Sequence, residues 1–195
     1  MDRSPAYLPC FASSKPLFTA EECRRIQAIG ERRPAIAGVV QRAAPSVQPH
    51  YEEGPERDSA VAFLDRGQET EWIYQRLFAI ARDANSQNWR FELSGSERLQ
   101  FARYGSDQHY NWHMDLASRG PNSFRKLSIT VQLSDPADYE GGNLEFKLDE
   151  GTTTTSRDRG VVTLFPSYVL HRVTPVTAGV RCSLVHWLRG DKPFA

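Results

Sequence analysis

The stretch YGSDQHYNWHMD (residues 104–115) organises this sequence, because it ends in two side chains that can bind a metal. His113 and Asp115 stand two positions apart. In an extended strand, side chains at that spacing point to the same face, so one imidazole nitrogen and one carboxylate oxygen converge. A second histidine from elsewhere would complete the group of two histidines and one carboxylate that holds non-haem Fe(II) and leaves coordination positions open.

A histidine late in the chain is the candidate for that third ligand. His171 lies in the short apolar run Val169–Val173, directly after a Phe-Pro-Ser turn. Taken singly, His171 has an ordinary alternative as a core histidine, and the pair His113 and Asp115 has one as surface residues. The order and spacing of all three favour a metal site.

A cation follows on the last long apolar run of the chain. Arg181 and Ser183 share one face of the strand expected there, so that a guanidinium and a hydroxyl point the same way. Such a pair suits a carboxylate at the closed end of a pocket, with Tyr104 as a further donor. Together with the three candidate ligands, the pair predicts a pocket for Fe(II) and a dicarboxylate.

The hydrophobic periodicity changes from helical to strand-like near residue 88. Thr19 and Glu22 form a capping box that opens a helix ending before Pro34, and an apolar stripe predicts a second helix, capped by Thr70 and ending near Asn85. Period-two runs follow at 89–93, 127–133, 144–146, 161–165, 169–173 and 180–188, with turn signals between them. Two helices followed by seven or eight short strands predict a helix-buttressed β-sandwich or jelly roll.

Two polar segments are expected outside the core. From Arg33 to Gly67 the sequence is rich in proline, glycine and charge, and only residues 61–64 resemble a strand. Most of this segment is therefore predicted to be ordered loop over the core, and it is a candidate lid. The run Thr152–Thr155 predicts a polar hairpin tip.

Composition places the chain among soluble, single-domain proteins. Its 195 residues suffice for one hydrophobic core, and 24 basic and 24 acidic residues leave no global field that would attract nucleic acid or an anionic membrane. Three widely spaced cysteines argue against a disulfide framework and suit a reducing cytosol. No signal-peptide pattern and no run of membrane-spanning length is present. We therefore expect a cytoplasmic protein with one domain over 1–195, a helical buttress at about 18–87 and a core at about 88–190.

The segment from about Phe18 to Phe194 resembles the prolyl 4-hydroxylase-like branch of the Fe(II)/2-oxoglutarate-dependent dioxygenases, most closely its PKHD type. The resemblance is carried by YG (104–105), YNWHMD (110–115), RKLS (125–128), VQLS (131–134), YEGGNLEF (139–146), FPS (165–167), HRVTPV (171–176) and RCSLVHW (181–187). It implies a mainly β (α+β) fold with a double-stranded β-helix core, a jelly roll of cupin-like type, buttressed by N-terminal helices. It also implies a hydroxylase that uses Fe(II), 2-oxoglutarate and O2, with ascorbate as a stimulant.

The resemblance assigns roles to the residues of the predicted pocket. It implies that His113, Asp115 and His171 bind iron and form the catalytic centre, and that Arg181 meets the distal carboxylate of 2-oxoglutarate beside Ser183 and Tyr104. Many collagen-type relatives have lysine where this chain has Arg181; either cation serves, and arginine binds in bidentate fashion.

Five further residues are candidates for contact with the substrate, namely Tyr110, Asn111, Trp112, Arg119 and Trp187. Arg125 is considered beside Arg119, although solvated charge is the commoner fate of such arginines. The two tryptophans have the alternative of being core residues, which is the commoner place for buried aromatics. His109 and His186 are expected to lie near the site or on the surface, and neither is favoured as a ligand.

The favoured function is hydroxylation of an aliphatic C–H bond of an amino-acid residue in a peptide or protein. A free amino acid or small metabolite is the alternative substrate: a long groove would favour the peptide, and a closed pocket with a spare arginine would favour a small acid. A non-catalytic cupin-like binding module would not require the three ligands and Arg181 together. Zero net charge makes nucleic acid a poor match as a substrate, and neither a membrane partner nor an oligomeric state is indicated.

Overall fold

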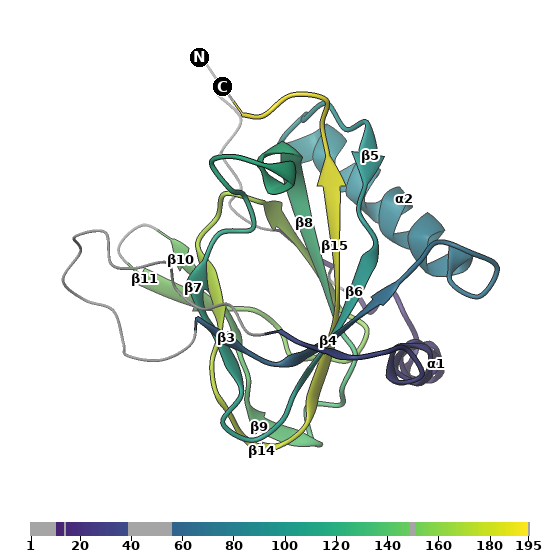
Figure 1. Cartoon of the computed structure of the whole chain (residues 1–195), viewed down its shortest axis with the longest axis vertical. Coiled ribbons are helices and arrows are strands. Elements are labelled where there is room, and N and C mark those ends of the chain that lie inside the picture. The colour runs from purple at the N-terminus through teal and green to yellow at the C-terminus, as the bar shows by residue number, and fades with distance from the viewer. Residues whose placement is uncertain (1–10, 14, 39–55, 149–150, 195) are drawn as a thin grey trace.

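The computed structural model describes residues 11–13, 15–38, 56–148 and 151–194. Figure 1 shows two β-sheets that face each other, with two helices packed against the outer side of the larger sheet. The helices are α1 (Ala20–Glu31) and α2 (Glu71–Asn88), and a short 3-10 helix, η1 (Pro121–Phe124), precedes one of the central strands.

The larger sheet has eight strands in the described part of the chain, and all its pairings are antiparallel. Its order is β1 (Phe11–Ala12), β12 (Val162–Pro166), β8 (Arg125–Gln132), β15 (Arg181–Arg189), β6 (Leu99–Tyr104), β4 (Ala60–Leu64) and β2 (Ile36–Ala37), with β5 (Gly95–Ser96) paired to the end of β15. The C-terminal strand β15 therefore lies near the middle of the sheet, where its side chains are held on both sides.

The smaller sheet faces the first across the interior. Its order is β11 (Gly151–Thr154), β10 (Leu144–Leu148), β13 (His171–Val173), β7 (His109–His113) and β3 (Arg57–Asp58). The pair β9 (Tyr139–Gly141) and β14 (Val176–Gly179) lies at the lower end of the molecule in Figure 1. Two facing antiparallel sheets with flanking helices are the mainly β jelly roll that the sequence predicts.

Strand β15 separates the hydrophobic core from the interior between the sheets. Its even-numbered side chains belong to the core beneath the helices or lie buried beside it, and they are Cys182, Leu184, His186 and Leu188. Its odd-numbered side chains point the other way and line cavities, and they are Arg181, Ser183, Val185, Trp187 and Arg189. The period of two thus gives one strand a core face and a polar face.

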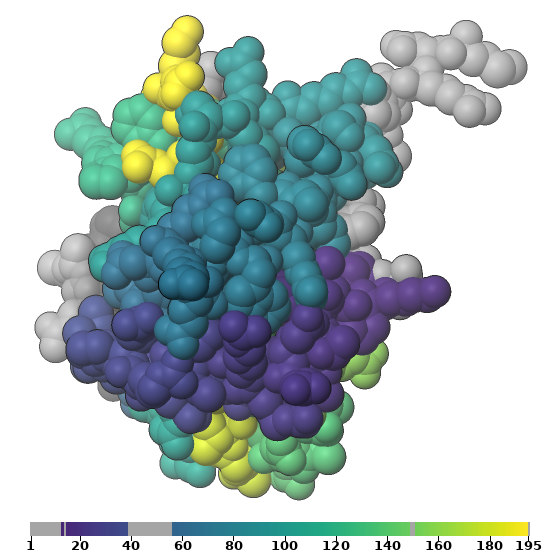
Figure 2. Space-filling view, turned by 90° about the vertical axis from the view of Figure 1, so that its right-hand side faces the viewer, coloured from purple at the N-terminus to yellow at the C-terminus, as the bar shows by residue number. Residues whose placement is uncertain are grey.

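Helix α1 begins as its sequence predicts. The Thr19 hydroxyl accepts a hydrogen bond from the backbone N–H of Glu22, and the Glu22 carboxylate accepts one from the backbone N–H of Thr19. Ile26 and Ile29, on its apolar side, are fully buried in the core. Figure 2 views the molecule from the side of the helices, where α1 in purple and the segment around α2 in teal cover most of the face.

The predicted strand at 89–93 is wrong, because helix α2 ends in a tight turn at this point. Arg90 adopts a left-handed backbone conformation with φ of 57°, which breaks any continuation as helix or strand. The Asn85 side chain then accepts a hydrogen bond from the backbone N–H of Phe91 and donates one to its carbonyl. Trp89, Phe91 and Leu93 still pack against other residues, so the alternation reflects burial without pairing.

Helix α2 also starts and ends differently from the prediction. It runs to Asn88, three residues beyond the expected end at Asn85. Thr70 stands at its N-terminus but makes no side-chain cap, since its hydroxyl donates to the carbonyl of Asp65 and accepts from the backbone N–H of Gly67. The hydroxyl closes the preceding turn instead of the first helical turn.

The polar segments follow the prediction in part. Strand β4 includes the expected run 61–64, and β2 and β3 are additional short strands in the same segment. Residues 39–55, which make up most of the predicted loop and candidate lid, and Cys10 lie outside the described residues. Strand β11 in the predicted hairpin tip is exposed throughout and pairs with β10.

Strand β6 was not predicted, although Leu99 and Phe101 alternate with Gln100, Ala102 and Tyr104. No helix in the described part of the chain combines the length and apolar character needed to cross a membrane.

The contact between α1 and the larger sheet gives a test of the packing. A Cβ at Gly30 would overlap the ring of Phe101, whereas a Cβ at Gly67 would meet nothing within 4 Å. Gly30→Ala is therefore expected to lower the free energy of unfolding by about 1–3 kcal/mol, because overpacking outweighs the better helix propensity of alanine. Urea denaturation measures the change, and Gly67→Ala is the matched control. Equal stability of the two variants would contradict this packing.

Candidate metal centre

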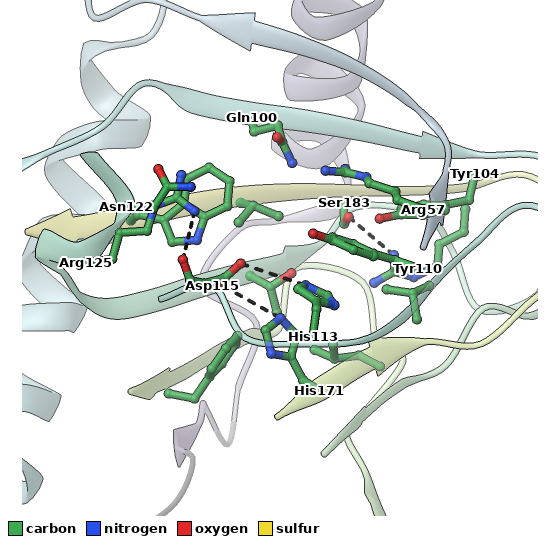
Figure 3. A pocket seen from close by; sticks show the side chains of 17 residues that line it. Arg57, Gln100, Tyr104, Tyr110, His113, Asp115, Asn122, Arg125, His171 and Ser183 are labelled. Atoms are coloured by element: carbon green, nitrogen blue, oxygen red, sulfur yellow. Dashed lines mark hydrogen bonds and ion pairs between the residues drawn. The ribbon is translucent and has the colours of Figure 1, made fainter. Parts of the chain in front are cut away.

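Three candidate ligands meet between the two sheets. His171 at the start of β13 lies directly opposite His113 at the end of β7 in the strand register. Asp115 follows β7, with its carboxylate oxygens 3.9 Å from His113 Nε2 and 3.7 Å from His171 Nε2. The ligand atoms of the three residues lie within 4.8 Å of one another, and all three side chains are buried (Figure 3).

Backbone hydrogen bonds orient both imidazoles toward the carboxylate. The Nδ1 atom of His113 lies 2.8 Å from the carbonyl of Asn111, and that of His171 lies 2.9 Å from the carbonyl of Val169. A carbonyl only accepts, so each Nδ1 carries the proton and each Nε2 keeps its lone pair for a ligand. Fixing the second ring nitrogen in this way is typical of metal-binding histidines.

Electrostatics place these groups in the protonation states that a metal requires. Burial, with a further contribution from His171, lowers the pKa of His113 to about 3. Burial by itself would raise the pKa of Asp115, but the two neighbouring histidines outweigh it and the pKa is lowered. At neutral pH the site therefore offers a neutral imidazole of His113 and an ionised carboxylate, the states in which these groups bind metals.

The donor set fits Fe(II). Two imidazole nitrogens and one carboxylate oxygen, all from one side, form the facial arrangement of non-haem iron oxygenases and leave the opposite positions for other ligands. Among the described residues, this is the one group of three or more histidine, cysteine or acidic side chains close enough to share an ion.

A β-bulge decides which neighbours of His113 face the site. Between the pairs His171–His113 and Val173–Tyr110, strand β7 contains one residue more than β13. The extra residue puts Tyr110 on the same face as His113, and their rings stack with centroids 3.4 Å apart. Simple alternation would instead place Asn111 there, so the bulge explains why Asn111 does not line the cavity.

Arg181 lines the cavity and is 1% exposed. Its Nη2 donates to Gln132 at 2.9 Å and its Nη1 to Ser183 at 3.4 Å, while its Cζ lies 5.4 Å from the ring centroid of Tyr104. Its buried Nε has no hydrogen-bond partner, and no carboxylate of the described residues lies within ion-pair distance. A buried guanidinium paired only with neutral groups suits an anionic ligand.

The cavity around these groups has a volume of about 220 Å³. Eight of the residues predicted for the site line it: Tyr104, Tyr110, His113, Asp115, His171, Arg181, Ser183 and Trp187. Asn111, Trp112 and Arg119 do not line it. Arg119 is exposed, and the ring of Trp112 lies beneath the guanidinium of Arg172 at 4.7 Å.

Sequence reasoning missed several lining residues. Arg57, from the short strand β3, lies with its Cζ 4.7 Å from the ring centroid of Tyr110, and no motif marks it. Gln100 of β6 and Thr130 of β8 also line the cavity, and their alternation in those strands is the one available signal. Arg125, considered from the sequence as a substrate contact, also lines the cavity and is held there by Glu97.

The two other considered histidines lie apart from the ligand cluster. His109 is on β7 outside the group, and its Nδ1 lies 3.1 Å from the Asp107 carbonyl. His186 is fully buried on the core side of β15, edge-on to Tyr74 with ring centroids 5.2 Å apart. It belongs to the packing against α2 and to neither the surface nor the metal group.

Comparison with known proteins shows which families this chain is similar to. The sequence model of the 2OG-Fe(II) oxygenase superfamily matches residues 99–189, which contain all three candidate ligands and Arg181. The match covers 91 of the 195 residues, just under half of the chain. A PKHD-type hydroxylase from Crocosphaera subtropica is 36% identical over 118 residues, or 57% of this chain and 53% of that protein. One from Sphingopyxis alaskensis is 36% identical over 127 residues, or 62% and 58%. This chain thus matches just over half the length of these relatives.

Solved structures share the fold over nearly the whole chain. A prolyl-4-hydroxylase from Pseudomonas putida has a TM-score of 0.67 at 21% identity, with 94% of each chain covered. A prolyl hydroxylase from Trichoplax adhaerens, in complex with a hypoxia inducible factor peptide fragment, has a TM-score of 0.71 at 16% identity, with 97% of this chain and 86% of that chain covered. The jelly-roll core predicted from the sequence is therefore confirmed.

Removing one candidate ligand tests the metal centre. His171→Ala is expected to weaken Mn(II) binding by on the order of 100-fold or more, because one imidazole and one carboxylate remain. Titration calorimetry measures the affinity. His109→Ala removes a histidine outside the cluster and should bind Mn(II) as the parent does; unchanged affinity in His171→Ala would contradict the site.

Burial of His186 predicts a pH dependence of stability. Burial lowers the pKa of its ring from 6.5 to about 4. Between these values the unfolded chain binds a proton that the folded protein does not, so stability falls as the pH falls through this window. Between pH 7 and pH 5, His186→Phe should lose about 1–2 kcal/mol less stability than the parent, measured by urea denaturation. The same loss in both proteins would show that His186 does not titrate this way.

Proposed function

We propose that this protein is an Fe(II)- and 2-oxoglutarate-dependent hydroxylase that acts on an aliphatic C–H bond of an amino-acid residue in a peptide or protein. One observation carries the proposal: the His113, Asp115 and His171 cluster shares a cavity with Arg181, a buried cation without an acidic partner among the described residues. A metal and an anion are the two ligands that this pair of features suits. The PKHD-type names of the curated relatives support the same reaction.

Each group has a defined task in this proposal. His113, Asp115 and His171 would hold Fe(II), which supplies the oxidative chemistry that converts 2-oxoglutarate, O2 and R–H into succinate, CO2 and R–OH. Arg181 would bind the C5 carboxylate of 2-oxoglutarate in bidentate fashion, exchanging its contacts with Gln132 and Ser183 for charged ones.

Tyr110 contributes shielding and orientation. Its ring covers one face of the His113 imidazole, and the guanidinium of Arg57 lies against the other face of this stack. Burial raises the pKa of its hydroxyl well above the usual range, so the group stays protonated and neutral across the working pH range. The ring of Tyr110 would in this way keep bulk water away from one side of His113.

Succinate formation tests the proposed activity directly. Purified protein with Fe(II), 2-oxoglutarate and O2, with and without ascorbate, should form succinate slowly alone and faster with a substrate from a panel of proline-containing peptides and free amino acids. Asp115→Ala is expected to abolish both rates, because the carboxylate ligand is lost. Absence of 2-oxoglutarate binding and of succinate under every condition would refute the proposal.

The role of Arg181 has its own test. Arg181→Ala should weaken 2-oxoglutarate binding about 10- to 100-fold, because a charge-assisted bidentate contact is removed, while Mn(II) binding stays within about twofold of the parent. Arg181→Lys should lie between the two. Arg103→Ala removes an exposed arginine from the outer face of the adjacent strand β6 and is the control. Equal 2-oxoglutarate affinity in Arg181→Ala and the parent would exclude this role.

A further inference from the structure

A groove of about 480 Å³ adjoins the cavity. Cavity and groove share Gln100, Arg125 and Trp187 in their walls, so the two spaces lie next to each other. The inner face of β15 forms a common floor: the odd-numbered residues from Arg181 to Trp187 line the cavity, and Trp187 and Arg189 line the groove. The accessible space therefore extends beyond the centre toward the end of this strand.

Arginines stacked on aromatic rings surround the groove. The guanidinium carbon of Arg98 lies 4.6 Å from the ring centroid of Phe63, and that of Arg189 lies 5.3 Å from the centroid of Phe124. The third arginine of the groove, Arg125, stacks on Trp187 at 3.8 Å. Stacking holds the planes of these guanidinium groups in place, which lowers the entropy lost when an anion binds to them.

The charges of the groove are unbalanced. Its described lining contains three arginines and one carboxylate, that of Glu97. Glu97 accepts two short hydrogen bonds from Arg125, at 2.8 and 2.6 Å, and lies 3.9 Å from Arg189. The charge of Glu97 is therefore largely neutralised by Arg125.

Arg98 and Arg189 are left with weak partners. Arg98 lies 3.6 Å from Asp65, but the two side chains are 57% and 77% exposed, and such pairs contribute little. The buried Nε of Arg189 makes no hydrogen bond. In a chain with zero net charge, this is a local excess of positive charge beside the cavity.

We propose that this groove binds acidic side chains of an extended peptide substrate, through Arg98 and Arg189, while the residue to be hydroxylated enters the cavity over Trp187. The inference rests on the proposed function and adds a substrate class to it. A free amino acid would fill the cavity and leave the groove unused. A nucleic acid would need a longer series of cations than the two weakly paired arginines found here.

Peptide binding tests the inference without requiring turnover. The test uses two fluorescein-labelled peptides of equal length, each with one central proline. One peptide carries glutamates at the positions that flank the proline, and the other carries glutamines there. By fluorescence anisotropy at low salt, the glutamate peptide should bind about tenfold more tightly, as expected from two charge pairs at a partly exposed site. Added salt should remove most of this preference.

Paired variants place the preference in the groove. The double variant Arg98→Gln, Arg189→Gln should bind both peptides alike, whereas Arg82→Gln, an exposed arginine of α2 outside both spaces, should keep the preference. The double variant should retain parental affinity for 2-oxoglutarate, because neither arginine lines the cavity of Arg181. Failure of the proposed function would instead appear as absent 2-oxoglutarate binding in the parent.

Three results would overturn the inference. The first is equal affinity of the parent for the glutamate and glutamine peptides. The second is displacement of the glutamate peptide by free glutamate at concentrations similar to those of unlabelled peptide, which would indicate a small acid as the substrate. The third is tighter binding of a single-stranded oligonucleotide than of the glutamate peptide, which would assign the groove to nucleic acid.

Discussion

The register between β7 and β13 is the constraint on which the site depends. It sets His113 directly opposite His171, and the bulge in β7 then turns Tyr110 onto the same face. A slip of one residue would carry the ligands to the opposite face of the smaller sheet, away from Asp115 and from the cavity. The metal centre is therefore a consequence of strand pairing, which is itself fixed by the buried face of the sheet.

The larger sheet provides the other half of the arrangement. Because β15 is central, one strand places Leu184 and His186 in the core and Arg181 and Ser183 at the cavity. A buried guanidinium that contacts only neutral groups is costly for the folded chain. Its position is understandable if the protein binds an anion there for much of its working cycle. The same strand leads from Arg181, at the cavity, to Trp187 and Arg189, which line the groove.

Residue types and spacing predicted the helices, most strands and the residues that converge, since these depend on local chemistry and on the strand period of two. The end of α2 was mispredicted because the left-handed turn at Arg90 depends on tertiary hydrogen bonds of Asn85. Asn111 was predicted as a pocket residue because nothing in the local sequence indicates the β-bulge in β7. Arg57 and the groove around Arg98 were missed because they come together only through pairing of distant strands.

The proposed function requires one ferrous ion and one keto-diacid to bind side by side between the sheets. The most direct measurement is a crystal structure of the protein grown with Mn(II) and 2-oxoglutarate, using anomalous scattering to locate the metal. We expect a single strong anomalous peak in contact with His113 Nε2, His171 Nε2 and the carboxylate of Asp115, with a carboxylate of 2-oxoglutarate on Arg181. A peak elsewhere, or 2-oxoglutarate bound away from Arg181, would contradict it.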